Sequence, residues 1–291
     1  MLGILIASAL AQEVDLSYLP KANEKTQVEI NTALDYRVHS EDREKTLKRD
    51  VTSSLRELYI QEVTSQNQDG PTGLTLDCTR SFFSRTADDG VGNVAANTHR
   101  HKQRLTVSRS DGAYKVMIGD AAGTALDGHV GRWLDFAALL PPTGRAARGD
   151  VWQPPMNKLS GLLIQTKPRS RVDKKEIEAE FAEAKVAGSI SCTLASLDGD
   201  VATIGFTGTL TASSSEDETV TVKIESGELK FSTSAHGPVS LTIKGSISIE
   251  RTVVEEEYRK DVMLTYRTKA GTIRIDSTKW ESTIGFSPAT E

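Results

Sequence analysis

The chain has 291 residues, of which 37% are apolar, and its 35 basic and 40 acidic side chains leave a net charge of −5. This mild acidic balance argues against nucleic acid as a partner, because phosphate backbones are bound by concentrated basic patches. The low apolar content favours sheets with one wet face over a doubly wound parallel sheet, whose strands are apolar on both faces. The length suffices for one large or two medium domains.

Residues 1–11 are predicted to be a secretory signal peptide. A short apolar run ends in Ala9-Leu10-Ala11, which has the small-x-small form of a signal-peptidase site. This run is too short to span a bilayer, and no later apolar run is long enough for a transmembrane helix. We therefore expect a protein exported to the periplasm or outside the cell. The alternative is an apolar N-terminal strand.

Residues 26–130 are predicted to form an N-terminal β-rich half, after a loose lead-in over 12–25. Apolar and polar side chains alternate from Val28 to Val38, and a period of two places alternate residues on opposite faces of a sheet. Residues 45–66 fit either a helical stripe or an extended chain, and we interpret them as one long bent strand.

Two more strand signals complete this half. A strand over 72–84 follows the turn signal of Asn67–Pro71. Alternation around Leu105 and Val116 predicts a hairpin across Ser110-Asp111-Gly112, since Asp-Gly is a favoured hairpin turn.

Helical spacing sets residues 131–187 apart, and we predict two or three short helices there. In the first, Trp133 and Phe136 recur at helical spacing before Pro141-Pro142 ends the run. The second follows two prolines, which are well placed at a helix start, and it carries Leu159 and Leu162.

A third helix is predicted after Asp173 and Glu176, which resemble a capping box. The competing prediction for 176–187 is a strand. We prefer the helix because Glu, Ala and Lys dominate this segment.

Residues 188–291 are predicted to form a C-terminal antiparallel β half. Apolar side chains alternate cleanly over 202–210 and again over 239–249, and the alternation changes parity at Ser226-Gly227, where we expect a bulge. The predicted fold class is therefore mostly β (α+β). It has two antiparallel, curved β-sheet halves, half-barrel or sandwich-like, with the short helices between them.

One combination of motifs carries a family resemblance. Gly149-Asp150-Val151-Trp152 is followed by a Leu229-Lys230-Phe231 strand, a His236-Gly237-Pro238 turn and a strand over Lys244–Ser248. This order resembles an uncharacterised family of exported, β-rich bacterial proteins, mostly from planctomycete-type genomes. The resemblance covers residues 130–286. It implies a secreted or periplasmic β-rich protein and supplies no catalytic residues.

The two cysteines, Cys78 and Cys192, each lie at an inward position of an alternating segment. In an exported protein they could pair as a disulfide. The alternative is that both act as small buried hydrophobes, since separate halves rarely bring two chosen residues within bonding distance.

No motif argues for catalysis, a metal or another cofactor. His99 and His101 would point the same way on a strand, but a metal site needs three or four ligands. Asp198-Gly199-Asp200 lacks the spaced oxygen ligands of a calcium loop and is typical of a hairpin turn. No Ser, His and Asp set has a spacing that indicates a triad.

The sequence therefore predicts a non-enzymatic protein that acts by binding or structure in the cell envelope or outside the cell. Its partner is unknown, and an envelope component is one candidate. The alternative is a carrier of a lipid or other hydrophobic ligand. A secreted hydrolase ranks third. The carrier's pocket would be walled by four residues of the helical middle, namely Trp133, Phe136, Leu159 and Leu162.

Overall fold

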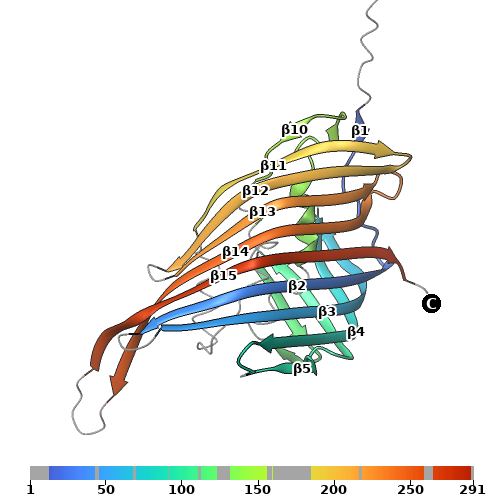
Figure 1. Ribbon diagram of the computed structural model, residues 1–291. Coiled ribbons are helices and arrows are strands. Elements are labelled where there is room, and N and C mark those ends of the chain that lie inside the picture. The colour runs from blue at the N-terminus through green and yellow to red at the C-terminus, as the bar shows by residue number, and fades with distance from the viewer. Residues whose placement is uncertain are drawn as a thin grey trace, which may run out of the picture.

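The computed structural model describes residues 13–42, 46–67, 70–90, 92–110, 113–122, 132–155, 159, 185–215, 218–258 and 265–289. Nearly all the described elements are β-strands. They form one 13-stranded sheet and a two-stranded sheet in which β1 (Val14–Asp15) pairs with β9 (Arg145–Ala146). The prediction of a mostly β, antiparallel protein is confirmed (Figure 1).

The large sheet is built from long strands, with short strands at its two edges. Its order is β10-β11-β12-β13-β14-β15-β2-β3-β4-β6-β7-β8, and β5 also pairs with β4. The long strands are β2 (Lys25–Asp42), β3 (Thr46–Asn67), β4 (Gly70–Ala87), β11 (Lys185–Asp198), β12 (Val201–Ser215), β13 (Glu218–Ser232), β14 (Gly237–Tyr258) and β15 (Thr265–Pro288). The short strands are β5 (Val94–Asn97), β6 (Gln103–Ser110), β7 (Ala113–Ile118), β8 (Ala121–Ala122) and β10 (Val151–Trp152).

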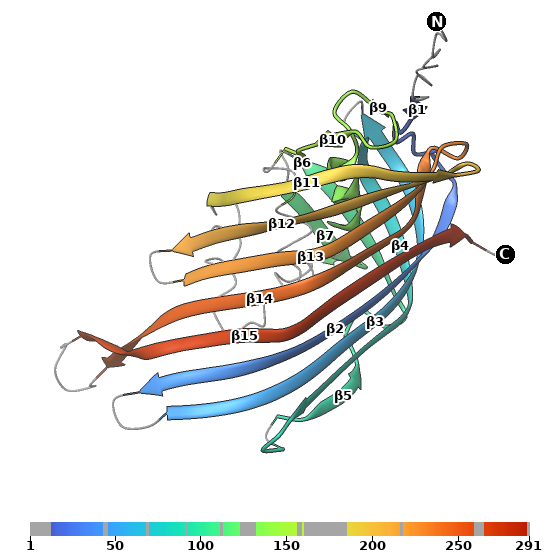
Figure 2. The same ribbon diagram turned by 45° about the horizontal axis from the view of Figure 1, so that its top comes forward.

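The N-terminal and C-terminal strands belong to one continuous sheet. The last strand, β15, pairs antiparallel with the first long strand, β2, from Gly271 opposite Asp42 to Pro288 opposite Thr26. In Figures 1 and 2, β15 and β2 lie side by side in the middle of the sheet. The two halves expected from the sequence are therefore joined through a long ladder of backbone hydrogen bonds.

A row of irregularities crosses the C-terminal strands and bends them together. Extra residues shift the pairing register at neighbouring places in four ladders: Phe206/Gly208, Ile224/Ser226, Gly245/Ser248 and Ser277/Lys279. A bulge bends and twists its strand, so an aligned series curves the sheet, as Figure 2 shows. The bulge predicted at Ser226-Gly227 is confirmed. At Gly245 a Cβ atom would lie 1.9 Å from the Lys223 carbonyl oxygen, so glycine permits this close approach.

The predicted helices are wrong for the described part of the chain, whose one helical element outside the masked stretches is the 3₁₀ helix η2 (Arg132–Leu139). A segment of eight residues is too short to form a stable α-helix on its own, and Pro141-Pro142 follows it. The end of the predicted third helix is strand instead, because Lys185–Ala187 pairs with Thr211–Ser213 of β12. The rest of that helix, and most of the second, lie outside the described residues.

The long ambiguous segment is strand, as predicted. Strand β3 covers Thr46–Asn67 and pairs with β2 on one side and β4 on the other. The hairpin predicted around residues 110–112 is confirmed by the pairing of β6 with β7. Two-residue periodicity therefore identified the strands on both sides of the middle segment.

Candidate ligand site on the inner face of the sheet

One face of the sheet, here called the inner face, gathers the apolar side chains. On β2 it carries Val28, Ile30 and Leu34, which are buried, whereas Glu29 and Asn31 on the outer face are exposed. Cross-strand pairing extends this face to both neighbours: Val28 lies opposite Tyr59 of β3 and Phe286 of β15. The same alternation continues on β12, β13 and β14, where the buried residues are Ala202, Ile204, Phe206, Leu210, Val222, Ile224, Leu229, Phe231, Leu241, Ile243, Ile247 and Ile249.

A small cap covers one end of the inner face, where β15 ends and β2 begins. Phe136 of η2 is fully buried and makes an edge-to-face contact with Tyr18, with ring centroids 4.9 Å apart. The ring of Phe136 also lies 6.0 Å from the ring of Phe286. Trp152 donates from Nε1 to the Leu139 carbonyl oxygen at 3.0 Å, which ties the edge strand β10 to this cap. In Figures 1 and 2 the sheet curves around η2.

Two of the four predicted pocket residues reach the apolar cluster of the inner face. Phe136 and Leu159 are both fully buried within it. Trp133 belongs to η2, but the structure does not describe its side chain, and Leu162 lies outside the described residues.

A buried ion pair interrupts the apolar inner face on β3 and β4. The Glu57 side chain is fully buried and that of Arg100 is 6% exposed. Glu57 Oε1 accepts hydrogen bonds from Arg100 Nη2 at 2.8 Å and Nε at 3.0 Å, and from Ser81 Oγ at 2.7 Å. These charge-assisted bonds offset the cost of removing both charges from water.

The connection between β5 and β6 is fastened to the sheet through the same cluster. Thr98 and Ser81 share a hydroxyl hydrogen bond of 2.6 Å, and the Ser81 N–H donates to His101 Nδ1 at 3.4 Å. Burial, and then the negative charge of Glu57, raise the pKa of the Tyr59 phenol. The cluster thus holds a loop in place with groups that are already engaged with one another.

The cysteines occupy distant parts of the sheet. Cys78 lies on β4 and Cys192 on β11, with six strands between them in the sheet order. Both are buried free thiols, and burial raises the pKa of Cys78 and of Cys192 to about 12. The structure therefore places them as separate buried hydrophobes, the alternative to the disulfide that the sequence left open.

The described ranges contain no cluster of three or more His, Cys, Asp or Glu side chains placed to hold a metal ion. His101 contacts the Ser81 backbone instead. Asp200 accepts hydrogen bonds from the hydroxyls of Ser232 and Ser234, which links two turns at one end of the sheet. Over the same ranges, no helix combines the length and apolarity that a membrane crossing requires.

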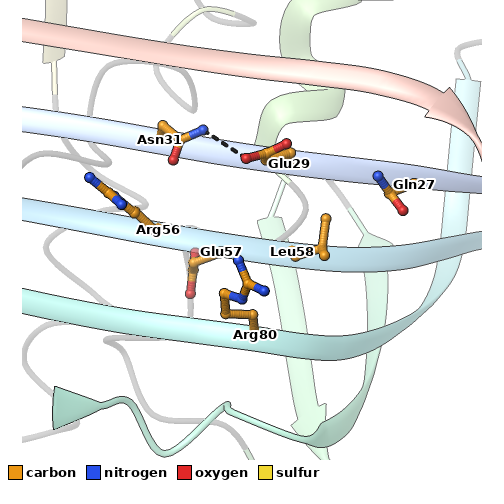
Figure 3. A pocket seen from close by; sticks show the side chains of 7 residues that line it. All are labelled: Gln27, Glu29, Asn31, Arg56, Glu57, Leu58 and Arg80. Atoms are coloured by element: carbon orange, nitrogen blue, oxygen red, sulfur yellow. Dashed lines mark hydrogen bonds between the residues drawn. The ribbon is translucent and has the colours of Figure 1, made fainter.

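The outer face carries a separate polar hollow of about 170 Å³, shown in Figure 3. Asn31 donates to Glu29 at 3.2 Å on its rim, and the side chains of Arg56 and Arg80 are exposed. Seven residues line it: Gln27, Glu29, Asn31, Arg56, Glu57, Leu58 and Arg80. Its mixed charges and open position distinguish it from the apolar inner face.

No family model and no curated protein matches the chain. Among solved structures, one of lipovitellin, titled for lipid–protein interactions, is 8% identical, with a TM-score of 0.38 over 92% of this chain. This chain covers 26% of that lipovitellin chain. An outer membrane channel from Pseudomonas putida F1 is 7% identical, with a TM-score of 0.25 over 94% of this chain and 98% of the channel. At these TM-scores neither likeness assigns a fold or a function.

Proposed function

We propose that the protein is a non-enzymatic binding protein that carries a lipid or another hydrophobic molecule against the inner face of its sheet. The observation that carries this proposal is the extent of the apolar inner face, whose buried side chains on β11 to β14 are all apolar among the described residues. Strand β12 alone, with 15 residues, spans about 50 Å.

The chemistry of the inner face supports an apolar ligand. Its buried side chains on β12 to β14 are aliphatic or aromatic, and burial of apolar area is the main favourable term in binding such a ligand. The inner face is also curved, so a bound chain would contact several strands at once. Phe136 and Leu159 would cover one end of this face.

Export is part of the proposal. It is supported by the Ala9-Leu10-Ala11 pattern and by the resemblance to exported β-rich proteins. We assign no catalytic role to the charged pair of Glu57 and Arg100 on the inner face, since the two side chains are engaged with each other. A carrier in the periplasm or outside the cell would shield its ligand from water between membranes or partners.

Native mass spectrometry of the protein purified from its own host tests the proposal directly. We expect a bound lipid-sized molecule that organic solvent extracts in stoichiometric amount. Protein freed of this molecule should then bind an environment-sensitive fluorescent fatty acid analogue.

A pair of neighbouring substitutions on β13 localises the binding. Val222→Trp places a large ring on the inner face and should weaken binding of the analogue by about tenfold or more, whereas Lys223→Trp places the same ring on the exposed face and should leave binding unchanged. Ligand-free protein that binds no apolar probe but sediments with an envelope fraction would replace this proposal with a structural role.

A further inference from the structure

A β-bulge on β4 places Arg80 at the polar hollow of the outer face. Cys78 lies opposite Tyr59 and Arg80 lies opposite Leu58, so Thr79 is an extra residue in the ladder. Cys78 is buried on the inner face, and strict alternation would put residue 80 on that face as well. The extra residue changes the alternation, and Arg80 is exposed on the outer face instead. Bulges often redirect a side chain beside a binding site.

Charged side chains from three neighbouring strands surround Leu58 in this hollow. Glu29 of β2 and Arg80 of β4 lie opposite Leu58 on its two sides. Strands lie about 4.8 Å apart, so the backbones of Glu29 and Arg80 are separated by about 10 Å. Arg56 is the preceding outward-facing residue of β3, and its backbone lies about 7–8 Å from that of its diagonal neighbour Arg80. In Figure 3 the Arg80 side chain extends from β4 toward β3.

The two arginines of the hollow are not held by acidic side chains. Arg56 and Arg80 are both exposed, and neither forms an ion pair with another residue in the described ranges. Glu57 also lines the hollow, but its carboxylate is buried and bound to Arg100. Glu29 supplies one negative charge against two positive charges. The outer hollow therefore has a net positive charge that a bound anion would neutralise.

The groups around the hollow suit a molecule with a phosphate at one end and an ammonium at the other. The two guanidinium groups come from different strands, and a phosphate has enough oxygen atoms to accept hydrogen bonds from both. On β2, Glu29 Oε1 accepts a hydrogen bond from Asn31 Nδ2 at 3.2 Å, and the carboxylate has further lone pairs for an ammonium group. The volume of about 170 Å³ is about ten times what one water molecule requires.

We propose that the outer hollow binds a small zwitterionic phosphate ester. Arg56 and Arg80 donate hydrogen bonds to the phosphate, and Glu29 accepts a hydrogen bond from an ammonium group a few atoms away. The site lies on the face opposite to the proposed carrier face, so it goes beyond the proposed function and does not depend on it. A soluble phosphoethanolamine and the headgroup of phosphatidylethanolamine present the same chemistry to this site.

Three probes with the same two-carbon unit test the charge pattern: phosphoethanolamine, ethyl phosphate and ethanolamine. The ammonium group makes phosphoethanolamine less negative than ethyl phosphate, so attraction to two arginines alone would favour ethyl phosphate. In calorimetric titrations of the full protein, we expect phosphoethanolamine to bind about fivefold or more tightly than ethyl phosphate, because the contact with Glu29 is added. Ethanolamine, which lacks the phosphate, should bind most weakly.

Substitutions of exposed residues assign the two ends of the ligand. Arg80→Gln should weaken phosphoethanolamine about tenfold, and Glu29→Gln should remove its advantage over ethyl phosphate. The matched control is Arg104→Gln, which removes an exposed arginine of β6 outside the hollow and should leave all three affinities unchanged. Each variant should still bind the fluorescent fatty acid analogue as the native protein does, so a failure of the outer site is distinguished from a failure of the carrier function.

Vesicles distinguish a lipid headgroup from a soluble ligand. Sedimentation with phosphatidylcholine vesicles that contain phosphatidylethanolamine, but not with pure phosphatidylcholine, would identify a headgroup if Arg80→Gln abolishes it. Binding of phosphoethanolamine without sedimentation would identify a soluble ligand. Native protein that binds ethyl phosphate as tightly as phosphoethanolamine, or that binds neither, overturns the inference. So does an Arg80→Gln variant with native affinity for phosphoethanolamine.

Discussion

The inner face of the sheet differs chemically between its two ends. On β11 to β14 the described buried side chains are apolar. The buried polar residues of this face come instead from β3, β4, β15 and the β5–β6 connection: Glu57, Gln61, Ser81, Arg100 and Ser282. One continuous sheet therefore contains two regions with the same two-residue period. The apolar region comprises β11 to β14, and the mixed region comprises β3, β4, β15 and the β5–β6 connection.

The difference means that the two regions are stabilised by different physics. Burial of apolar area is non-directional, so a swap between apolar side chains of similar volume is tolerated. A buried ion pair depends on both partners, because removing one leaves an uncompensated charge out of water. The predictions below test whether the regions fail in these different ways.

The largest expected effect is in the mixed region. Glu57→Gln keeps the size of the side chain but leaves the buried Arg100 guanidinium without a counter-charge, and it should lower the free energy of unfolding by about 4 kcal/mol. Urea denaturation measures this change. The control is Asp50→Asn, which breaks the exposed 2.7 Å pair with Arg37 and should give no measurable change. Equal effects at the two sites would contradict a special role for burial.

The apolar region should respond to volume instead. Leu229→Ala deletes a fully buried side chain on β13 and should cost about 3 kcal/mol through lost burial and a residual cavity. Leu229→Met conserves volume and should cost less than about 1.5 kcal/mol. Both are measured by the same denaturation experiment. If Leu229→Met lowers the free energy of unfolding as much as Glu57→Gln does, the two regions do not differ in the proposed way.

The sequence predicted the strands well because their period is a local signal. Alternation located β2, β4 and the strands from β11 to β15, and a change of parity located the bulge near Ser226. The pattern over residues 45–66 was ambiguous, and its interpretation as a long strand is confirmed by β3. The helix predicted up to residue 187 was wrong because propensity is a weak preference, and pairing of β11 with β12 outweighs it at Lys185–Ala187.

The polar features of the inner face could not be predicted in the same way. Glu57 occupies an inner position of β3, but nothing nearby in the sequence separates it from an exposed glutamate. Its partner Arg100 follows 43 residues later. The pairing of β15 with β2, which joins the two ends of the chain, likewise has no local signal in the sequence. One usable signal was missed: charged residues at inward positions of strands.

The two cysteines place the same thiol group in each of the two regions, because Cys78 lies on β4 and Cys192 lies on β11. Because both thiols are buried with a pKa of about 12, neither should react with a disulfide reagent at pH 8 in the folded protein, and both should react after unfolding. Their contribution to stability is complete below the ordinary thiol pKa of about 9 and is lost as the pH rises toward 12. Failure to detect thiols in unfolded, unreduced protein would instead establish a disulfide between Cys78 and Cys192.

The smallest expected effect concerns Asp200, whose carboxylate lies at an exposed turn next to the apolar region. Hydrogen bonds from Ser234 and then Ser232 hold the pKa of Asp200 below its usual value of 3.8. A lowered pKa stabilises the folded state above the unfolded-state pKa, and this contribution is lost as the pH falls through the folded-state pKa. The melting temperature of the native protein should therefore slightly exceed that of Asp200→Asn at pH 6, and the gap should close below about pH 3.8. A difference in melting temperature that persists in acid would show that the charge of the Asp200 carboxylate does not stabilise this turn. It would also show that Asp200 and Glu57 differ in more than their exposure.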